Sequence, residues 1–129
     1  GRQMKIDHLD HLVITTANLE ECLHFYVDIL GMELDDSNHR YAVRFGNQKI
    51  NIHREKAEHL PAARHVTYGS QDLCLIAEGN IEDIQAEITA KGYPIELGIV
   101  ERNGACGPIY SIYLRDADEN LVEISIYKK

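Results

Sequence analysis

The stretch Tyr113-Leu-Arg-Asp-Ala-Asp-Glu-Asn-Leu-Val-Glu-Ile124 contains the pattern that decides the fold, a strand, a turn and a second strand. Polar and apolar residues alternate from Ser111 to Arg115, which is the two-residue period of a strand. Residues 116–120 are rich in Asp and Asn, whose side chains hydrogen-bond to nearby backbone in turns. Residues 121–127 predict a second strand, with Glu123 on the face opposite to its branched apolar residues. Such a carboxylate is a ligand, a base or a solvated residue, and the strand pattern alone favours the solvated residue.

The same order of elements occurs twice along the chain. Each half reads as a strand, a helix and three strands, and the helices begin at the N-caps Asn18 and Asn80 and end at Gly31 and Gly92. Residues 100–108 read as a glycine-bearing loop within the second half. The predicted strands are residues 9–15, 32–36, 40–45 and 49–53 in the first half, and residues 72–77, 94–97, 109–115 and 121–127 in the second. This internal repeat predicts two modules of the same topology.

The alternation within the strands assigns residues to two faces of each sheet. Leu12, Ile14, Leu73 and Leu75 form the apolar faces, which we expect the helices to cover. The other faces are then free to line a shared interior. They carry His11, Asn51, Asp72 and Glu123.

Length and composition define the class of protein. The chain has 129 residues, of which 44% are hydrophobic and 26% charged, as expected for one folded domain with its own core. The formal net charge of −8 and the absence of a basic stripe exclude nucleic acid and anionic membranes as expected partners. No apolar run is long enough for a membrane span or a signal peptide. An odd number of cysteines, Cys22, Cys74 and Cys106, predicts a reducing, cytoplasmic location.

The first three residues precede a methionine. We interpret Gly1, Arg2 and Gln3 as additions before a natural start at Met4.

Taken in order, five motifs make the chain resemble the vicinal oxygen chelate superfamily. This superfamily includes glyoxalase I, fosfomycin-resistance proteins, bleomycin-binding proteins and extradiol dioxygenases. The run from Gly104 to Tyr113 is most similar to its glyoxalase-domain-containing branch, some bacterial members of which are called virulence-associated. The motifs are Asp10-His11-Leu12-Val13-Ile14, Phe25-Tyr26 with Leu30-Gly31-Met32, Gly46 to His53, Gly69 to Leu75, and Asp116 to Glu123.

The resemblance implies an α+β fold of two βαβββ modules, whose curled mixed sheets surround a central cavity for metal and substrate. The domain would span residues 6–127. Module one is residues 6–54, module two is residues 70–127, and residues 55–69 form an irregular linker between them.

Metal ligands in the family come from the first and last strand of each module. Carried over, they are His11, Asp72 and Glu123, and Glu123 is also the catalytic base. Asn51 stands where glyoxalase I has glutamate, so it contacts substrate or water instead. The expected substrate-binding residues are Asn51, His53, Tyr113 and Arg102.

Each of these residues also has a plainer interpretation. Asp72 is then a turn residue entering its strand, and His53 is a histidine at the surface of a strand end. His53 would be the substitute ligand if Asp72 does not bind the metal. Tyr113 is then a packed tyrosine, and Arg102 is a solvated arginine in the predicted loop.

The resemblance implies a divalent-metal enzyme of glyoxalase I type, a lyase or isomerase whose small substrate chelates the metal through adjacent oxygens. The expected metal is nickel, manganese, iron, cobalt or zinc. One alternative is an extradiol ring-cleavage dioxygenase, although that chemistry favours iron held by two histidines and one carboxylate. The other is a metal-free binding or resistance protein. The concave face of each module needs a second module, which is either the other module of the same chain or a module of a second copy. In short members of the family the linker often leads to exchange between two copies, so the expected partner is a second copy with shared sites.

Overall fold

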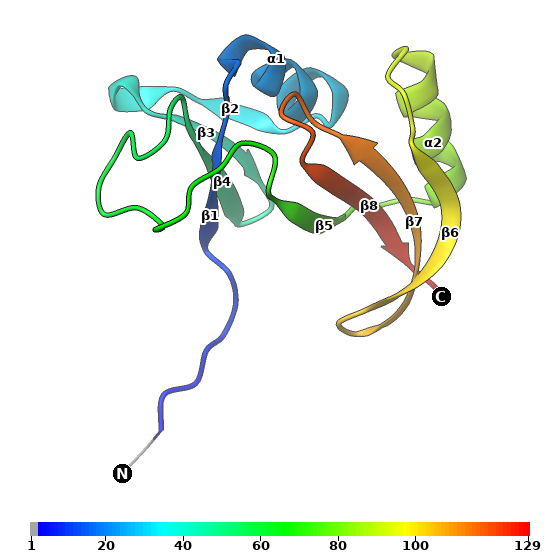
Figure 1. The fold of residues 1–129 in the computed structure, drawn as a ribbon. Helices are drawn as coiled ribbons and strands as arrows, with labels where there is room; N and C mark the ends of the chain where they lie inside the picture. The colour runs from blue at the N-terminus through cyan, green and yellow to red at the C-terminus, as the bar shows by residue number, and fades with distance from the viewer. Residues whose placement is uncertain (1–2) are drawn as a thin grey trace.

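The computed structural model describes residues 3–129, which form two four-stranded sheets and two principal helices (Figure 1). The interpretation of Gly1 and Arg2 as additions concerns residues outside this range. The elements are β1 (His11–Thr15), α1 (Leu19–Leu23), η1 (His24–Ile29), β2 (Glu33–Asp35), η2 (Ser37–His39), β3 (Tyr41–Phe45), β4 (Gln48–His53), β5 (Asp72–Ile76), α2 (Ile81–Ala90), β6 (Leu97–Gly104), β7 (Gly107–Arg115) and β8 (Leu121–Tyr127).

The two sheets have the same topology. The strand order is β1-β4-β3-β2 in the first and β5-β8-β7-β6 in the second. In each sheet the first strand pairs in parallel with the last, and the other pairs are antiparallel. The predicted α+β fold and its internal repeat are therefore confirmed.

Both helices begin and end where the sequence predicts. The Oδ1 of Asn18 accepts from the backbone N–H of Glu21 at 3.1 Å, and the Oδ1 of Asn80 accepts from that of Asp83 at 2.9 Å. Gly31 ends the first helical segment with φ +77. The second half of this segment widens into the π-helix η1, which the helical spacing of its apolar residues does not reveal.

The strand predicted at residues 94–97 and the loop predicted at residues 100–108 are wrong. A single strand, β6, runs from Leu97 to Gly104, and only a two-residue turn separates it from β7. The glycines that suggested a loop are needed instead because neighbouring atoms approach their Cα atoms closely. A Cβ at Gly98 would lie 2.7 Å from Cγ2 of Ile112, and one at Gly104 would lie 2.8 Å from the hydroxyl of Tyr127. These glycines allow close approach within the sheet rather than ending it.

One hydrophobic core joins the two modules. It contains Ile14 and Val43 from the first sheet, Leu114 and Val122 from the second, and Phe25 from η1. As predicted, Leu12, Leu73 and Leu75 pack against it. The faces of the sheets that are turned away from this core are called the open faces below.

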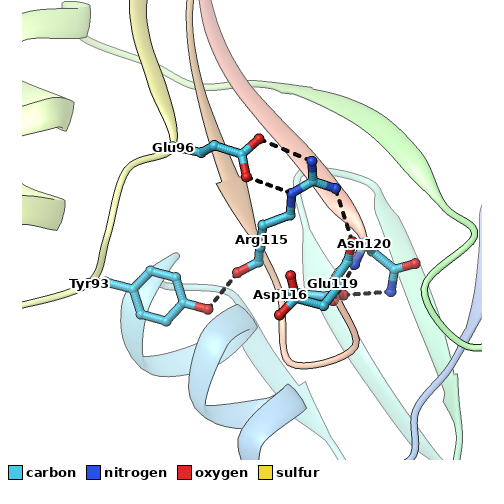
Figure 2. Close-up of polar contacts among 6 residues, drawn as sticks. All are labelled: Tyr93, Glu96, Arg115, Asp116, Glu119 and Asn120. Atoms are coloured by element: carbon cyan, nitrogen blue, oxygen red, sulfur yellow. Dashed lines mark hydrogen bonds and ion pairs between the residues drawn. The ribbon is translucent and has the colours of Figure 1, made fainter.

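The turn between β7 and β8 is fixed by its own side chains. Asp116 Oδ1 accepts from the backbone N–H groups of Asp118 at 2.9 Å and Asn120 at 3.0 Å, as the turn chemistry predicts. Asn120 donates from Nδ2 to Asp116 Oδ2 at 2.8 Å (Figure 2). The Tyr26 hydroxyl donates to the same Oδ2 at 2.7 Å, which joins the first module to the turn of the second.

Arg115 holds this turn against the chain that enters β6. Its Nε and Nη2 each donate to one carboxylate oxygen of Glu96 at 3.0 Å, and Nη1 donates to the carbonyl of Glu119 at 3.2 Å (Figure 2). The hydroxyl of Tyr93 donates to the Arg115 carbonyl at 2.6 Å. This bidentate pair fixes the orientation of the strand end.

Two segments lie outside the sheets. Residues 3–10 extend away from the body of the molecule before β1 (Figure 1). Residues 54–71, between β4 and β5, form neither helix nor strand. Within residues 3–129, no helix is long and apolar enough to cross a membrane.

Candidate functional site

His11 lies on the open face of the first sheet, at the start of β1, where it pairs in register with Lys49 of β4. Its Nδ1 lies 2.8 Å from Oδ2 of Asp10. A carboxylate accepts this bond, so Nδ1 carries the proton and Nε2 keeps a free lone pair. Metal-binding histidines usually have such a carboxylate partner, because it fixes both the tautomer and the ring.

Glu123 lies on the open face of the second sheet, in the middle of β8. Its Oε2 accepts from the hydroxyl of Ser111 at 2.6 Å and from that of Ser125 at 3.3 Å. Both serines are fully buried. The hydrogen bonds orient the carboxylate and leave Oε1 free to bind a metal or move a proton.

Asp72 begins β5 and is exposed. Strand register places it on the same open face as Glu123, because Asp72 pairs with Leu121 and Cys74 pairs with Glu123. Asp72 and His11 both line a cavity of about 320 Å³ between β1 and β5. Within residues 3–129 of one chain, however, no group of three or more His, Cys, Asp and Glu side chains is close enough to hold a metal ion.

The donors nevertheless suit a divalent metal in chemical type. One imidazole with a free Nε2 and two carboxylates form a hard or borderline ligand set. Within residues 3–129 of one chain they do not come together as one ligand group. The residues therefore fit a divalent metal in chemical type only.

Cys74 also lies on this open face, beside Glu123. Its Sγ lies 3.3 Å from the hydroxyl of Ser125. Burial and the nearby Glu123 carboxylate raise the pKa of the Cys74 thiol, which keeps it protonated. A protonated thiol is a poor nucleophile, in agreement with the absence of a catalytic role for it in the sequence analysis.

Two of the expected substrate-binding residues come together. Asn51 and His53, both on β4, line a cavity of about 220 Å³ on the open face of the first sheet. His53 also lines a larger cavity of about 520 Å³ under the linker. Its ring lies 5.1 Å from that of His59. Burial and the charge of His59 lower the pKa of the His53 imidazole.

The other two expected substrate-binding residues form a pair of their own. Arg102 donates from Nε to the hydroxyl of Tyr113 at 3.0 Å, and its guanidinium lies 5.5 Å from the centre of that ring. Tyr113 pairs with Glu123 in the ladder, so the arginine, the tyrosine and the glutamate share an open face. The prediction that Arg102 lies in a loop is wrong, because it belongs to β6.

Sequence reasoning missed the residues that orient these groups. Asp10 directly precedes His11, and this adjacency is a signal that could have identified it. Ser111 and Ser125 become visible only when the register of β7 against β8 is known, because they pair directly with each other. Arg40 and Lys49 line the cavity that contains Asn51, and the sequence analysis gave neither of them a role, although Lys49 lies in the motif Gly46 to His53.

Comparison with known proteins gives the chain its family. The model of the Glyoxalase/Bleomycin resistance protein/Dioxygenase superfamily matches residues 8–124. The chain is 46% identical over 126 residues to virulence protein STM3117 of Salmonella typhimurium, covering 97% of this chain and 88% of that protein. It is 41% identical over 127 residues to the glyoxalase domain-containing protein RDO1 of Mycosarcoma maydis, covering 98% of this chain and 72% of that protein.

Solved structures agree with this match. The crystal structure of STM3117 superposes with a TM-score of 0.93 at 45% identity, over 97% of this chain and 100% of that one. A lactoylglutathione lyase from Agrobacterium tumefaciens shares the fold, with a TM-score of 0.72 at 21% identity over 95% of each chain. Two βαβββ modules, a family model that spans both and relatives that are 46% and 41% identical together lead to one conclusion: the chain belongs to the glyoxalase/bleomycin resistance protein/dioxygenase superfamily.

Proposed function

We propose that the protein is a divalent-metal-dependent lyase or isomerase of glyoxalase I type, which works as a homodimer. The metal is held by His11 from one copy and by Asp72 and Glu123 from the other. The observation that supports this most strongly is that the buried Ser111 orients Glu123 through a hydrogen bond of 2.6 Å, while Asp10 lies 2.8 Å from His11. Metal-binding side chains commonly have such hydrogen-bond partners.

A bound divalent cation would supply Lewis-acid polarisation of two adjacent substrate oxygens. The residues of the chain do the remaining work. Glu123 takes a proton from one substrate carbon through its free Oε1 and returns it to the neighbouring carbon. Ser111 and Ser125 keep Oε2 occupied and so aim Oε1 at the substrate. Tyr113, next to Glu123 in the ladder and held by Arg102, donates its hydroxyl to a substrate oxygen.

A metal-free small-molecule binding protein is the second candidate. It is favoured by the cavity of about 520 Å³ under the linker, which exists within one chain and is lined by apolar and polar residues in equal number. The dioxygenase alternative is less well supported, because the ligand set has one histidine and two carboxylates.

Metal binding distinguishes these candidates. Metal-stripped protein is titrated by calorimetry with nickel, manganese, cobalt, zinc and, without oxygen, ferrous iron. We expect one metal per chain, and Glu123→Gln should weaken its affinity by roughly 100-fold, since even substitution of a residue that only hydrogen-bonds to a metal ligand costs about 10–100-fold. The matched control is Glu82→Gln on the exposed surface of α2, which should bind metal like the wild type.

Each outcome selects a function. Metal binding that depends on Glu123, followed by isomerisation of thiol adducts of 2-oxoaldehydes, supports the lyase. Ferrous iron with oxygen uptake on catechols selects the dioxygenase instead. Failure of every metal to bind, with both variants behaving alike, refutes the metal enzyme and leaves the binding protein.

A further inference from the structure

The cavity around Asn51 is positively charged in an otherwise acidic protein. Arg40, Arg44 and Lys49 line it against a single carboxylate, Asp35, so its formal charge is positive while that of the whole chain is −8. Its volume is about 220 Å³, enough for a small polar group but not for a large ligand. The local charge is therefore opposite to that of the whole chain.

The cations of this cavity are not equivalent. Arg44 is occupied, because its Nε donates to Oδ2 of Asp35 at 2.9 Å. Asp35 also accepts from the hydroxyl of Ser37 at 2.7 Å. The hydrogen bonds from Ser37, followed by the one from Arg44, lower the pKa of the Asp35 carboxyl to about 2. Asp35 therefore stays ionised and keeps its ion pair with Arg44.

Arg40 and Lys49 are available. Among the residues that the structure describes, neither side chain has a carboxylate within 4.0 Å or a hydrogen-bond partner. The charge of Arg40 acts on His53, whose pKa it helps to lower. Asn51 also lines the cavity and adds an amide. An arginine fork, an ammonium and an amide around one small cavity match the acceptors of an oxyanion.

A second cavity lies directly beside this one, and His53 lines both. It measures about 520 Å³, and apolar residues, namely Val13, Pro61, Val66 and three alanines, form half of its lining, the other half being polar. A ligand that spans His53 would therefore place a charged end on Arg40 and Lys49 and an apolar body under the linker.

We propose that the open face of the first sheet is an oxyanion-binding site, which takes a small molecule with a carboxylate or phosphoryl group at one end and an apolar body at the other. Lys49 is the strand neighbour of His11, so the oxyanion lies beside the proposed metal position. The assignment of this ligand class to the substrate rests on the proposed function, whereas binding of the oxyanion itself does not.

The test uses protein from which metal has been stripped and the chelator then removed by dialysis, so that neither metal nor the carboxylates of the chelator play a part. Benzoate, phenylphosphonate, inorganic phosphate and the neutral benzyl alcohol are titrated while amide NMR shifts are followed. We expect benzoate or phenylphosphonate to shift Arg40, Lys49 and Asn51 and to bind at least tenfold more tightly than benzyl alcohol. Whichever of benzoate and phenylphosphonate binds more tightly shows whether the site prefers a carboxylate or a phosphoryl group. Weaker binding of inorganic phosphate shows the contribution of the apolar body.

Variants locate the site. Arg40→Gln and Lys49→Gln should each lower the affinity for the tighter-binding probe by about tenfold, the loss expected for one charge-assisted hydrogen bond. Lys129→Gln removes the same charge from an exposed position at the end of the chain and should change nothing. Equal binding of benzyl alcohol, or equal losses in Lys49→Gln and Lys129→Gln, would overturn the proposal. Oxyanion binding without any metal binding would refute the proposed enzyme but leave this site standing.

Discussion

At the scale of single residues, the hydroxyl of Tyr26 links the first module to the second. It donates to Oδ2 of the buried Asp116 at 2.7 Å, across 90 positions of sequence. Burial, followed by the Asp116 charge, raises the pKa of the Tyr26 phenol, so it remains a donor at every pH at which the protein is folded.

Tyr26→Phe removes this donor and leaves a buried carboxylate short of one partner. We expect the free energy of unfolding to fall by about 1.5–3 kcal/mol, the range for a hydrogen bond to a charged group. Urea unfolding measures it. Tyr68→Phe is the matched control, because Tyr68 is 41% exposed. Equal effects in the two variants would contradict a special role for Tyr26.

Glu58 gives the linker an acid-dependent anchor. Arg54 donates to it from Nε at 3.0 Å and also from its backbone N–H. Hydrogen bonds from the Arg54 side chain are the main reason why the pKa of Glu58 falls from 4.5 to about 2. The folded state therefore binds the Glu58 proton less well than the unfolded state does.

The resulting stability is fully present above pH 4.5 and is lost as the pH falls towards 2. Wild type should exceed Glu58→Gln in unfolding free energy at pH 5, and the difference should shrink steadily by pH 2.5. Denaturant unfolding of both proteins at pH 5 and at pH 2.5 gives the four free energies of unfolding that the comparison needs. A constant difference between the two proteins would show that Glu58 does not titrate with folding.

At the scale of elements, β6 depends on a glycine. Gly98 has φ +138, and an added Cβ would lie 2.7 Å from Cγ2 and 2.8 Å from Cα of Ile112. Gly107 has a similar φ of +136, but nothing lies within 4 Å of its Cβ position. The two glycines thus separate backbone strain from steric contact.

Gly98→Ala should lower the free energy of unfolding through both backbone strain and steric contact, by about 2–5 kcal/mol in total. Gly107→Ala should lower it through strain alone, by about 1–3 kcal/mol. Thermal unfolding of the two variants measures the difference. A loss in Gly107→Ala as large as that in Gly98→Ala would mean that contact with Ile112 contributes nothing.

The elements that local chemistry determines could be predicted from the sequence. Asn18 and Asn80 cap their helices through their own side chains, and residues 121–127 alternate as a strand must. β6 could not be predicted, because the reason for Gly98 lies on another strand, at Ile112. The same holds for the site. His11 and Glu123 follow from motifs, but their orientation by Asp10 and Ser111 needs the side-chain geometry, and the Arg40 cavity needs the register of the sheet.

At the scale of the whole molecule, the shared core decides how a site can form. The helices and both sheets meet in one core, and the proposed dimer would place a second copy against the open faces. In such a dimer, module one of each copy faces module two of the other.

Mixing inactive variants tests this arrangement. His11→Ala and Glu123→Ala, unfolded together and refolded as an equal mixture, should recover roughly a quarter of the wild-type metal sites, because half of the dimers are mixed and one of their two sites is intact. Calorimetry with the preferred metal counts the sites. The control mixes Asp72→Ala with Glu123→Ala, whose defects both lie in module two, and should recover none. Equal recovery in the two mixtures, or a monomer in sedimentation, would refute shared sites.

The bond between Tyr26 and Asp116 also affects how the protein is made in the cell. Because the ribosome synthesises the chain from its N-terminus, Tyr26 is made 90 residues before its hydrogen-bond partner Asp116. At about 5–20 residues per second, this delay lasts roughly 5–18 s. During that time the first sheet and its helix lack the apolar surface of the second module, with which they form one core. The nascent first half therefore exposes apolar surface during synthesis, and the bond between Tyr26 and Asp116 forms only when the last turn has emerged.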